Sequence, residues 1–327
     1  MEPGLPSALK AGIDRELEGR RRADLAARTA ATTAAYRAGR TSAAAIRSED
    51  DALAYALARL PATYAAAATV FAEARRTAPG FAPATLLDAG SGPGGGSWAA
   101  KAAWPSLERI AWLDASAPFL ALAGRLAGGA LDATPTRGDL TAGGFPHADL
   151  VLASYALAEI APDRQQALVL DLWAAADGVL ALVEPGTPAG SARILAARDV
   201  LIGAGAAILA PCPHHAPCPL AAPAGRRPGV PGWCHFAVRL PRSRDHRLAK
   251  GADAPFEDEK FAYLLAARPD VAARPRSARV LARPRAGKPG IDLELCTGTG
   301  ALDHRHVPRR DRPAHAAARR LNWGDAL

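Results

Sequence analysis

The sequence predicts an α/β fold in which helices cover a parallel, doubly wound sheet. Short apolar runs alternate with helical segments through residues 84–204, and this alternation is typical of repeated β–α units. The first two runs each end in an aspartate, and a glycine-rich turn follows the first. With 327 residues, 49% of them hydrophobic, the chain is long enough to bury a sizeable core.

Residues 7–78, which precede this alternation, are predicted to be helical. Alanine, leucine, arginine and glutamate dominate there, and all four favour helices. A break is expected at residues 39–48. The next helix is expected to begin near Ser48, because the acids that follow it favour the helix dipole, and Pro61 is expected in the first turn of a further helix.

The elements of the sheet follow in order from residue 84. Strands are expected at residues 84–90, 109–116, 148–157 and 178–186, with a poorly defined strand ahead of 136–140 and helices between them. After the cysteine-rich stretch 210–236, residues 233–240 are expected to resume the sheet, 258–268 to form a helix, and 278–285 and 291–296 to form strands.

These expectations divide the chain into four parts. Residues 1–78 form an N-terminal helical extension, and residues 79–209 form the core of the sheet. Residues 210–302 hold a cysteine-rich insertion and complete the sheet, and residues 303–327 form a basic tail.

The glycine-rich turn reads Asp88-Ala89-Gly90-Ser91-Gly92-Pro93-Gly94 and closely resembles the signature turn of the class I S-adenosylmethionine-dependent methyltransferases. The resemblance implies a Rossmann-like methyltransferase sheet with S-adenosylmethionine as cofactor. It implies cofactor contacts from Asp88, Gly90, Gly92 and Gly94, with Asp114 at the ribose and Asp139 at the adenine ring. A dinucleotide fold is the main alternative, because Gly90, Gly92 and Gly95 also fit GxGxxG. Each aspartate alone also suits a strand-end turn or a helix cap.

The sequence assigns no catalytic residue. Enzymes that methylate the amino groups of bases usually carry an (N/D)PP(Y/F) motif after the fourth strand, whereas this chain has Ala153-Ser154-Tyr155-Ala156. Pro211-Cys212 looks like the nucleophilic Pro-Cys of RNA cytosine methyltransferases, but it follows a later helix. Cofactor binding is therefore predicted, and methyl transfer is left open.

All four cysteines are candidate metal ligands: Cys212, Cys218, Cys234 and Cys296. Four thiolates can hold tetrahedral Zn²⁺ or an iron–sulfur cluster. The spacing matches neither a zinc ribbon nor the tight run of bacterial ferredoxins. Two disulfides or buried free thiols are the alternatives, and nothing marks the chain for an oxidising compartment. His214, His215 and His235 flank the cysteines and are interpreted as loop or strand residues.

The net charge of +8 is concentrated in the last quarter of the chain. Residues 239–327 carry 19 Lys and Arg against 11 Asp and Glu, whereas the preceding residues balance. A concentrated basic segment favours a nucleic-acid partner, with a solvated arginine-rich surface as the alternative. No apolar run is long enough for a transmembrane helix, and the N-terminus lacks a secretory pattern. A bacterial cytoplasmic monomer is expected.

A wider resemblance rests on ordered segments: VEPGTPAG (183–190), APCPH (210–214), CPL (218–220), WCHF (233–236), EDEKFAYL (257–264) and WGD (323–325). Together they resemble the family of the mitochondrial methyltransferase-like protein seventeen, a small-subunit ribosome assembly factor, with its yeast and bacterial relatives. The resemblance implies association with the small ribosomal subunit and its rRNA. It also implies that the four cysteines hold a [4Fe–4S] cluster. An active rRNA methyltransferase and a zinc-stabilised methyltransferase of another substrate remain alternatives.

Overall fold

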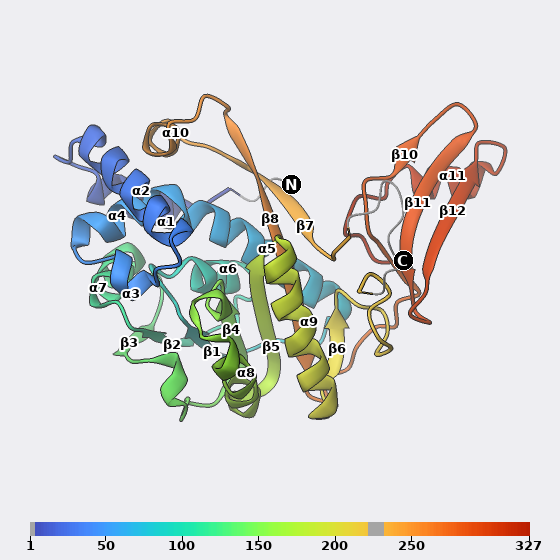
Figure 1. The fold of residues 1–327 in the computed structure, drawn as a ribbon, viewed down its shortest axis with the longest axis horizontal. Coiled ribbons are helices and arrows are strands. Elements are labelled where there is room, and N and C mark those ends of the chain that lie inside the picture. Colours follow the sequence, from blue (N-terminus) through green and yellow to red (C-terminus); the bar gives the residue numbers. More distant parts are fainter. Residues whose placement is uncertain (1–3, 222–231) are drawn as a thin grey trace.

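The computed structural model describes residues 4–221 and 232–327. Its main body is an eight-stranded sheet in the order β3-β2-β1-β4-β5-β8-β6, with β7 paired to β8 (Figure 1). The strands are β1 (Thr85–Ala89), β2 (Arg109–Asp114), β3 (Ala133–Arg137), β4 (Ala148–Ser154), β5 (Ala176–Pro185), β6 (Ala207–Ala210), β7 (Phe236–Pro241) and β8 (Phe256–Ala267).

The order and direction of the strands define the fold class. Strands β1 to β5 run parallel, whereas β8 is antiparallel to each of its partners, β5, β6 and β7. A parallel sheet with one antiparallel strand next to the last position is the class I S-adenosylmethionine-dependent methyltransferase fold, so the predicted fold class is confirmed. The alternation of strands and helices predicted the parallel α/β sheet, and the resemblance of the glycine-rich turn predicted its methyltransferase class.

The prediction of a helix at residues 258–268 is wrong, because this stretch lies in β8. The side chains of its segment Phe261–Ala267 are buried on both faces of the sheet. Along its edges, β8 pairs with β5 on one side and with β6 and β7 on the other. A short apolar run fits a buried strand and a buried helix equally well by periodicity alone. Pairing with the neighbouring strands therefore outweighs the helix preference of its alanines and leucines.

Helices cover both faces of the sheet. One hydrophobic core lies between the sheet and α5 (Leu60–Thr77), α6 (Gly95–Ala103) and α7 (Ala117–Ala127). The second core lies on the other face, under α8 (Pro162–Ala175) and α9 (Pro188–Gly203). No helix in the described part of the chain is long and apolar enough to cross a membrane.

Residues 7–78 of the N-terminal extension are mainly helical, as predicted, and pack on the main body. They form α1 (Ser7–Glu16), α2 (Arg22–Arg37), α3 (Ser42–Ala45), α4 (Glu49–Ala58) and α5, which covers one face of the sheet. The Ser48 hydroxyl caps α4 by accepting a hydrogen bond from the Asp51 N–H, and the Asp51 carboxylate accepts one from the Ser48 N–H, which is a capping box. Pro61 lies in the first turn of α5, as expected.

A long hairpin connects this extension to the sheet. Strands β7 and β8 continue beyond the end of β5, and α10 (Arg244–Lys250) lies between them. At its tip, Arg22 of α2 donates to Asp245 of α10 at 2.9 Å. Figure 1 shows this hairpin rising to the level of the N-terminal helices.

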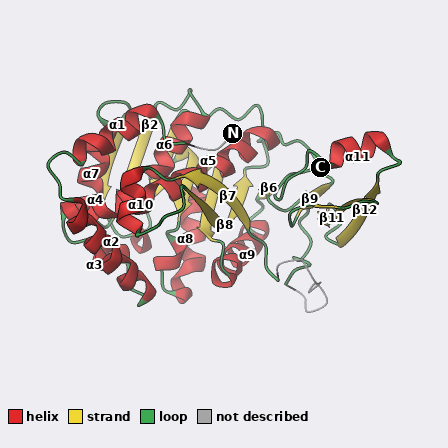
Figure 2. Cartoon of the chain, turned by 90° about the horizontal axis from the view of Figure 1, so that it is seen from above, coloured by secondary structure: helices red, strands yellow, loops and turns green. Residues whose placement is uncertain are grey.

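The last part of the chain forms a second, smaller sheet beside the main body (Figure 2). Its elements are β9 (Ala278–Val280), β10 (Arg285–Ala286), β11 (Gly290–Thr297), β12 (Leu302–Pro308) and α11 (Arg312–Ala318). The basic tail was expected to begin at residue 303, but this position lies inside β12, which pairs with β11 along its length. The chain then returns along β9, where the Leu327 N–H donates to the Ala278 carbonyl at 2.9 Å.

Candidate functional site

The glycine-rich turn joins the end of β1 to the start of α6. Gly90, Gly92 and Gly94 have positive φ angles of 76°, 53° and 85°. This left-handed region is accessible to glycine without steric cost, so the three glycines allow the tight turn. A Cβ atom on Gly92 would meet nothing within 4 Å, so the turn is open on that side.

Two predicted aspartates meet at this turn. Asp88 is 1% exposed and accepts a hydrogen bond from the Ser97 hydroxyl at 2.6 Å, and burial raises its pKa to about 6. Asp114 accepts from the Gly92 and Ser116 N–H groups, each at 2.8 Å, and burial also raises its pKa. Asp114 therefore fastens the glycine turn to the end of β2.

The third predicted aspartate, Asp139, lies one strand further along the sheet. It is exposed and caps a short 3-10 helix, Leu140–Ala142, by accepting from the Thr141 N–H at 2.8 Å. Its neighbour Gly138 donates to the Asp114 carbonyl at 3.1 Å, so the two acids lie on adjoining strand ends. The structure brings Asp88 and Asp114 together and leaves Asp139 at the rim.

Two serine hydroxyls at the same edge lack a partner. The Oγ atoms of Ser91, in the glycine turn, and Ser154, at the end of β4, are buried without a hydrogen-bond partner in the described part of the chain. Buried polar groups are normally satisfied, so an unsatisfied pair marks a place where a ligand or ordered water belongs. Sequence reasoning assigned no role to either serine.

The N-terminal extension covers this edge. The Ser42 N–H donates to the Glu159 carboxylate at 2.7 Å, and the Tyr36 and Ser42 hydroxyls lie 2.7 Å apart. Glu159 follows β4, and burial raises its pKa. The Tyr55 ring packs against Phe119 at the start of α7, with centroids 4.9 Å apart. The N-terminal helices thus border the ends of β2 and β4.

A buried polar cluster stands where a base-methylating motif would lie. Tyr155 follows β4 with a φ of 59°, a strained value for a residue other than glycine. Its hydroxyl donates to Glu259 of β8 at 2.8 Å, and Arg59 lies 3.4 Å from the same carboxylate oxygen. Burial keeps the pKa of Tyr155 well above its usual value, so the phenol retains the proton that it donates.

The four cysteines line one cavity of about 50 Å³, although they are far apart in the chain. Cys212 and Cys218 follow β6, Cys234 precedes β7, and Cys296 lies on β11 of the small sheet. All four thiols are free. No group of three or more His, Cys, Asp or Glu side chains among the described residues is arranged to hold a metal ion.

Burial in this cavity favours the protonated thiol over the thiolate unless a positive charge lies nearby. Burial raises the pKa of Cys212, and it raises that of Cys296 to about 12. The pKa of Cys234 is raised well above its usual value, first by burial and then by the other three cysteines. Bringing four negative sulfur atoms together here therefore requires compensation by positive charge.

Two buried arginines line the same cavity. Arg198 is 2% exposed and donates to the carbonyls of His214 and Ala216 at 3.0 and 2.7 Å. Arg279 is 1% exposed, donates to the Pro211 carbonyl at 2.8 Å and pairs with Glu73 of α5 at 2.6 Å. Both guanidinium groups lower the pKa of nearby thiols, against the effect of burial.

One flanking histidine contacts a cysteine. His214 Nε2 lies 3.2 Å from Cys296 Sγ, and its Nδ1 lies 3.0 Å from the Ala216 carbonyl. Burial and then Arg198 lower the pKa of His214, so the neutral ring donates through Nδ1 and accepts from the Cys296 thiol. His215 accepts from the Ile208 N–H at 3.1 Å, and His235 stacks on Trp233, as expected for loop and strand residues.

Comparison with known proteins decides the family. The family described as "Mitochondrial small ribosomal subunit Rsm22" matches residues 49–327. The chain belongs to the Rsm22 family. A human relative, the ribosome assembly protein METTL17 of mitochondria, is 32% identical over 300 residues, which cover 84% of this chain and 62% of the human protein. The suspected family is therefore confirmed, and the Rsm22-family chain spans less than two thirds of that relative.

Several solved structures named as methyltransferases are similar to this chain at low sequence identity. The magnesium protoporphyrin IX methyltransferase of Synechocystis is 16% identical, with a TM-score of 0.41, over 63% of this chain and 83% of its own. The precorrin-6y C5,15-methyltransferase of Geobacter metallireducens is 14% identical, with a TM-score of 0.39, over 62% of this chain and 86% of its own.

Proposed function

We propose that this Rsm22-family chain is a methyltransferase-like protein that binds the rRNA of the small ribosomal subunit, or its precursor, during ribosome assembly. The observation that carries the proposal is a set of exposed cations on the small sheet that form no ion pair within the described residues. They are Arg283, Lys288, Arg309, Arg310, Arg312, Arg319 and Arg320. The name of the human relative, a ribosome assembly protein, supports the same partner.

Four of these cations belong to one end of the small sheet. Gly290 pairs with Pro308, and the Arg309 N–H donates to the Pro289 carbonyl at 3.0 Å, so the segments around Lys288 and Arg309 adjoin. We call this end the basic tip; it comprises Lys288, Arg309, Arg310 and Arg312. Cations without acidic partners are free to neutralise phosphates, which releases the counterions of the nucleic acid.

Salt-dependent binding tests this proposal. Fluorescence anisotropy would follow labelled small-subunit rRNA as purified full-length chain is added at increasing salt concentrations. We expect the affinity to fall steeply with salt, with a logarithmic slope of about −0.7 to −0.9 for each phosphate contact. Binding that is absent, or that does not respond to salt, contradicts the proposal.

We also infer that the edge formed by β1, β2 and β4 binds S-adenosylmethionine, whose sulfonium supplies a transferable methyl group. The open side of Gly92 and the unpartnered hydroxyls of Ser91 and Ser154 support this inference. The residues that would hold the cofactor are Asp88, Gly90, Gly92, Gly94, Asp114 and Asp139.

A matched pair of glycine variants tests the cofactor site. Gly92→Ala adds a methyl group on the open side of the turn, whereas Gly129→Ala adds one beyond α7; both glycines have a positive φ and open surroundings. Each variant should lose about 1 kcal/mol of stability. By calorimetry, only Gly92→Ala should lose S-adenosylmethionine affinity, by at least about tenfold. Equal affinity in the two variants contradicts the site.

We further propose that Cys212, Cys218, Cys234 and Cys296 hold a [4Fe–4S] cluster. Four thiols on one cavity match the donor set of such a cluster. The buried guanidinium groups of Arg198 and Arg279 are paired with Asp199 and Glu73, yet both lower the pKa of Cys212 and would favour its thiolate form in such a centre. Its role would be structural, because Cys296 belongs to the small sheet and the other three adjoin the main sheet.

Anaerobic purification with metal analysis tests the cluster. We expect a brown protein containing iron and sulfide, and each single Cys→Ser variant should lose iron and accumulate less. A colourless protein with one zinc per chain contradicts the cluster and supports a zinc site with the same ligands.

Methyl transfer to rRNA is a second candidate function, favoured by the strained Tyr155 at the cofactor edge. It predicts a methylated nucleotide in small-subunit rRNA whose methylation is lost when the gene for this protein is deleted. An unchanged modification map on deletion rules out this candidate and leaves the binding function standing.

A further inference from the structure

A second hollow lies between the two sheets. It is a cleft of about 510 Å³ bounded by the β7–β8 hairpin on one side and by the small sheet and α11 on the other. Its lining includes Arg239 and Asp258 from the hairpin, and Arg283, Arg319, Asn322 and Trp323 from the last part of the chain. This cleft is separate from the basic tip, because none of the four tip residues lines it.

The charge in the cleft is positive. Asp258 accepts two hydrogen bonds from the Arg239 guanidinium, each at 2.8 Å, so this carboxylate is neutralised. Arg239 is also held in place by the Phe256 ring, whose centroid is 4.0 Å from the guanidinium carbon. Arg283 and Arg319 are exposed and form no ion pair within the described residues, so they leave two uncompensated charges in the lining.

The remaining lining is suited to a flat, partly apolar group. Ile291, Leu321 and the ring of Trp323 contribute apolar surface. Trp323 is fixed by an edge-to-face contact with His235, with ring centroids 4.9 Å apart. Aromatic side chains in a positively charged groove are the recurring platform for single-stranded nucleic acid, because bases stack on the ring while cations follow the backbone.

The size of the cleft limits what can enter. Its volume lies within the range of about 300–1,000 Å³ that is typical of small-molecule sites. Such a space accommodates one or two unpaired nucleotides, whereas a base-paired helix is too wide. The exposed basic tip does not discriminate between single-stranded and duplex RNA, because both present phosphates to it.

We propose that this cleft binds an unpaired segment of RNA, with phosphate groups at Arg283 and Arg319 and a base against Trp323. The inference rests on the proposed rRNA binding and adds that the chain prefers single-stranded over duplex RNA. The basic tip supplies general affinity, and the cleft supplies the preference.

Two variants with the same change of charge test the proposal in the full chain. The cleft variant is Arg283→Ala/Arg319→Ala, and the tip variant is Arg309→Ala/Arg310→Ala. The probes are a single-stranded RNA of about 12 nucleotides, within the site sizes of known single-strand binders, and a duplex of the same composition. All four arginines are exposed, so both variants should unfold at the same denaturant concentration as the parent chain.

The cleft variant is expected to lose at least about tenfold in affinity for the single strand, with little change for the duplex. Its salt slope for the single strand should become shallower by about 1.4, as expected for two lost phosphate contacts. The tip variant should weaken both probes alike. Trp323→Phe should abolish the part of the tryptophan fluorescence quenching that the single strand causes at the cleft.

Each other outcome is decisive. If the parent chain binds neither RNA, the proposed rRNA binding fails. If it binds RNA but the cleft and tip variants lose both probes equally, the cleft proposal is overturned and rRNA binding stands. If polyglutamate binds the parent chain but not the cleft variant, and single-stranded RNA does not compete with it, the cleft recognises an acidic protein segment and the proposal is overturned.

Discussion

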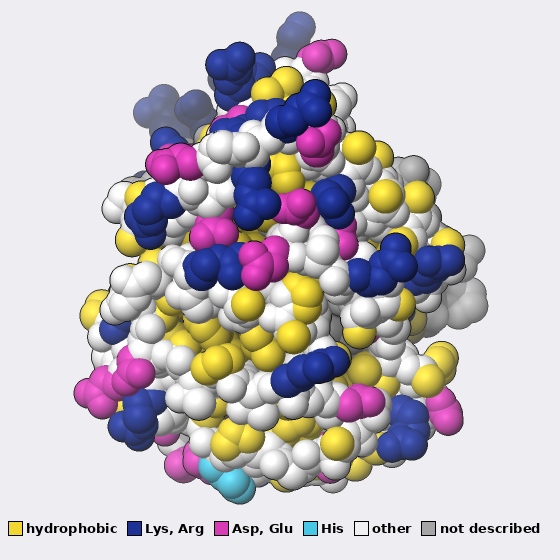
Figure 3. Space-filling model, turned by 90° about the vertical axis from the view of Figure 1, so that its left-hand side faces the viewer, with side chains coloured by type: hydrophobic (Ala, Val, Ile, Leu, Met, Phe, Trp, Pro, Cys, Tyr) yellow, Lys and Arg dark blue, Asp and Glu magenta, His cyan; other side chains and the backbone are white. Residues whose placement is uncertain are grey.

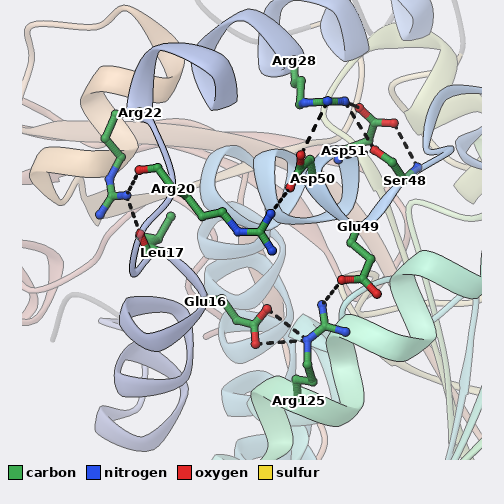
Figure 4. A network of polar contacts seen from close by, with 10 residues as sticks. All are labelled: Glu16, Leu17, Arg20, Arg22, Arg28, Ser48, Glu49, Asp50, Asp51 and Arg125. Atoms are coloured by element: carbon green, nitrogen blue, oxygen red, sulfur yellow. Dashed lines mark hydrogen bonds and ion pairs between the residues drawn. The ribbon is translucent and has the colours of Figure 1, made fainter.

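The two ends of the molecule differ in how many of their arginines pair with acids: several in the N-terminal layer do, whereas on the small sheet only Arg279, Arg285 and Arg305 do among the described residues. In the N-terminal layer, Arg20 pairs with Asp50 at 2.5 Å, Arg28 pairs with Asp51 at 2.7 Å, and Arg125 of α7 bridges to Glu16 and Glu49 (Figure 4). Figure 3 shows this face, where Lys and Arg side chains alternate with Asp and Glu. On the small sheet, the arginines of the basic tip, together with Arg283 and Arg319 in the cleft, are exposed and form no ion pair within the described residues.

The difference teaches that pairing, and not the number of cations, distinguishes a structural arginine from a binding one. The excess of charge lies in the last quarter of the sequence, yet several cations there are already engaged. Arg242 and Lys250 pair with Glu257, and Arg279 pairs with Glu73. Only the remainder is available to a polyanion, and only the tertiary structure separates the two groups.

The largest effect is expected from breaking the most buried pair. Arg279→Met removes the buried guanidinium that lies 2.6 Å from Glu73, which is 3% exposed and keeps, among the described residues, only the surface cation Arg76 at 2.5 Å and Arg276 at 3.8 Å. Removing one partner of a buried ion pair costs about 3–5 kcal/mol, because the other charge remains buried. Urea unfolding measures the loss, and Arg319→Met, at an exposed arginine, is the control. Equal stability of the two variants contradicts the structural role assigned to Arg279.

Asp88 is a buried carboxyl whose pKa no cation of the described residues lowers, so it tests the effect of burial without ion pairing. Burial raises the pKa of Asp88 to about 6, whereas an aspartate in an unfolded chain has a pKa of about 3.9. The native carboxyl keeps a proton that the unfolded chain releases, so the free energy of unfolding should fall by roughly 3 kcal/mol between about pH 4 and pH 6.

Asp88→Asn should reduce this dependence, because the amide does not ionise and its oxygen can still accept from Ser97. Asp114 and Glu159, whose pKa values burial also raises, should retain the remainder. Unfolding curves collected across this pH range compare the variant with the parent chain. A parent chain whose stability is flat over the range shows that Asp88 is not desolvated as described.

Removing unpaired cations should change binding and leave folding intact. Arg309→Ala/Arg310→Ala should make the salt slope of rRNA binding shallower by about 1.4 to 1.8, one step for each lost phosphate contact. Its stability should stay within about 0.5 kcal/mol of the parent chain, since both side chains are exposed. A large loss of stability with unchanged rRNA binding would show that the arginines of the basic tip are structural and do not bind rRNA.

The smallest effect is expected at the opposite end. Arg20→Ala/Arg28→Ala carries the same charge change as the tip variant, but it removes partly exposed ion pairs with Asp50 and Asp51. Such pairs contribute about 0–1 kcal/mol each, so thermal unfolding should shift only slightly. Anisotropy should detect no change in rRNA affinity, and a loss as large as that of the tip variant contradicts the comparison.

The sequence by itself determined the alternating sheet, the glycine turn after β1 and the family. These features are local: a strand, a turn that requires positive φ, and short ordered segments are all contained in neighbouring residues. Asp88 and Asp114 were predicted from the resemblance of the turn to the methyltransferase signature, and both lie at the ends of the first two expected strands. The four cysteines were also predicted as one set of ligands, but the cavity that they line and its two arginines were not.

Tertiary structure alone decided the features that depend on contacts between distant segments. Residues 258–268 were expected to be a helix, and they form a strand because β5 and β6 supply partners on both sides. Glu259 meets Tyr155 and Arg59 only after that strand pairs, and Cys296 joins the other thiols only after the small sheet docks. Which arginines are neutralised likewise depends on acids brought from elsewhere in the chain, and spacing in the sequence does not contain that information.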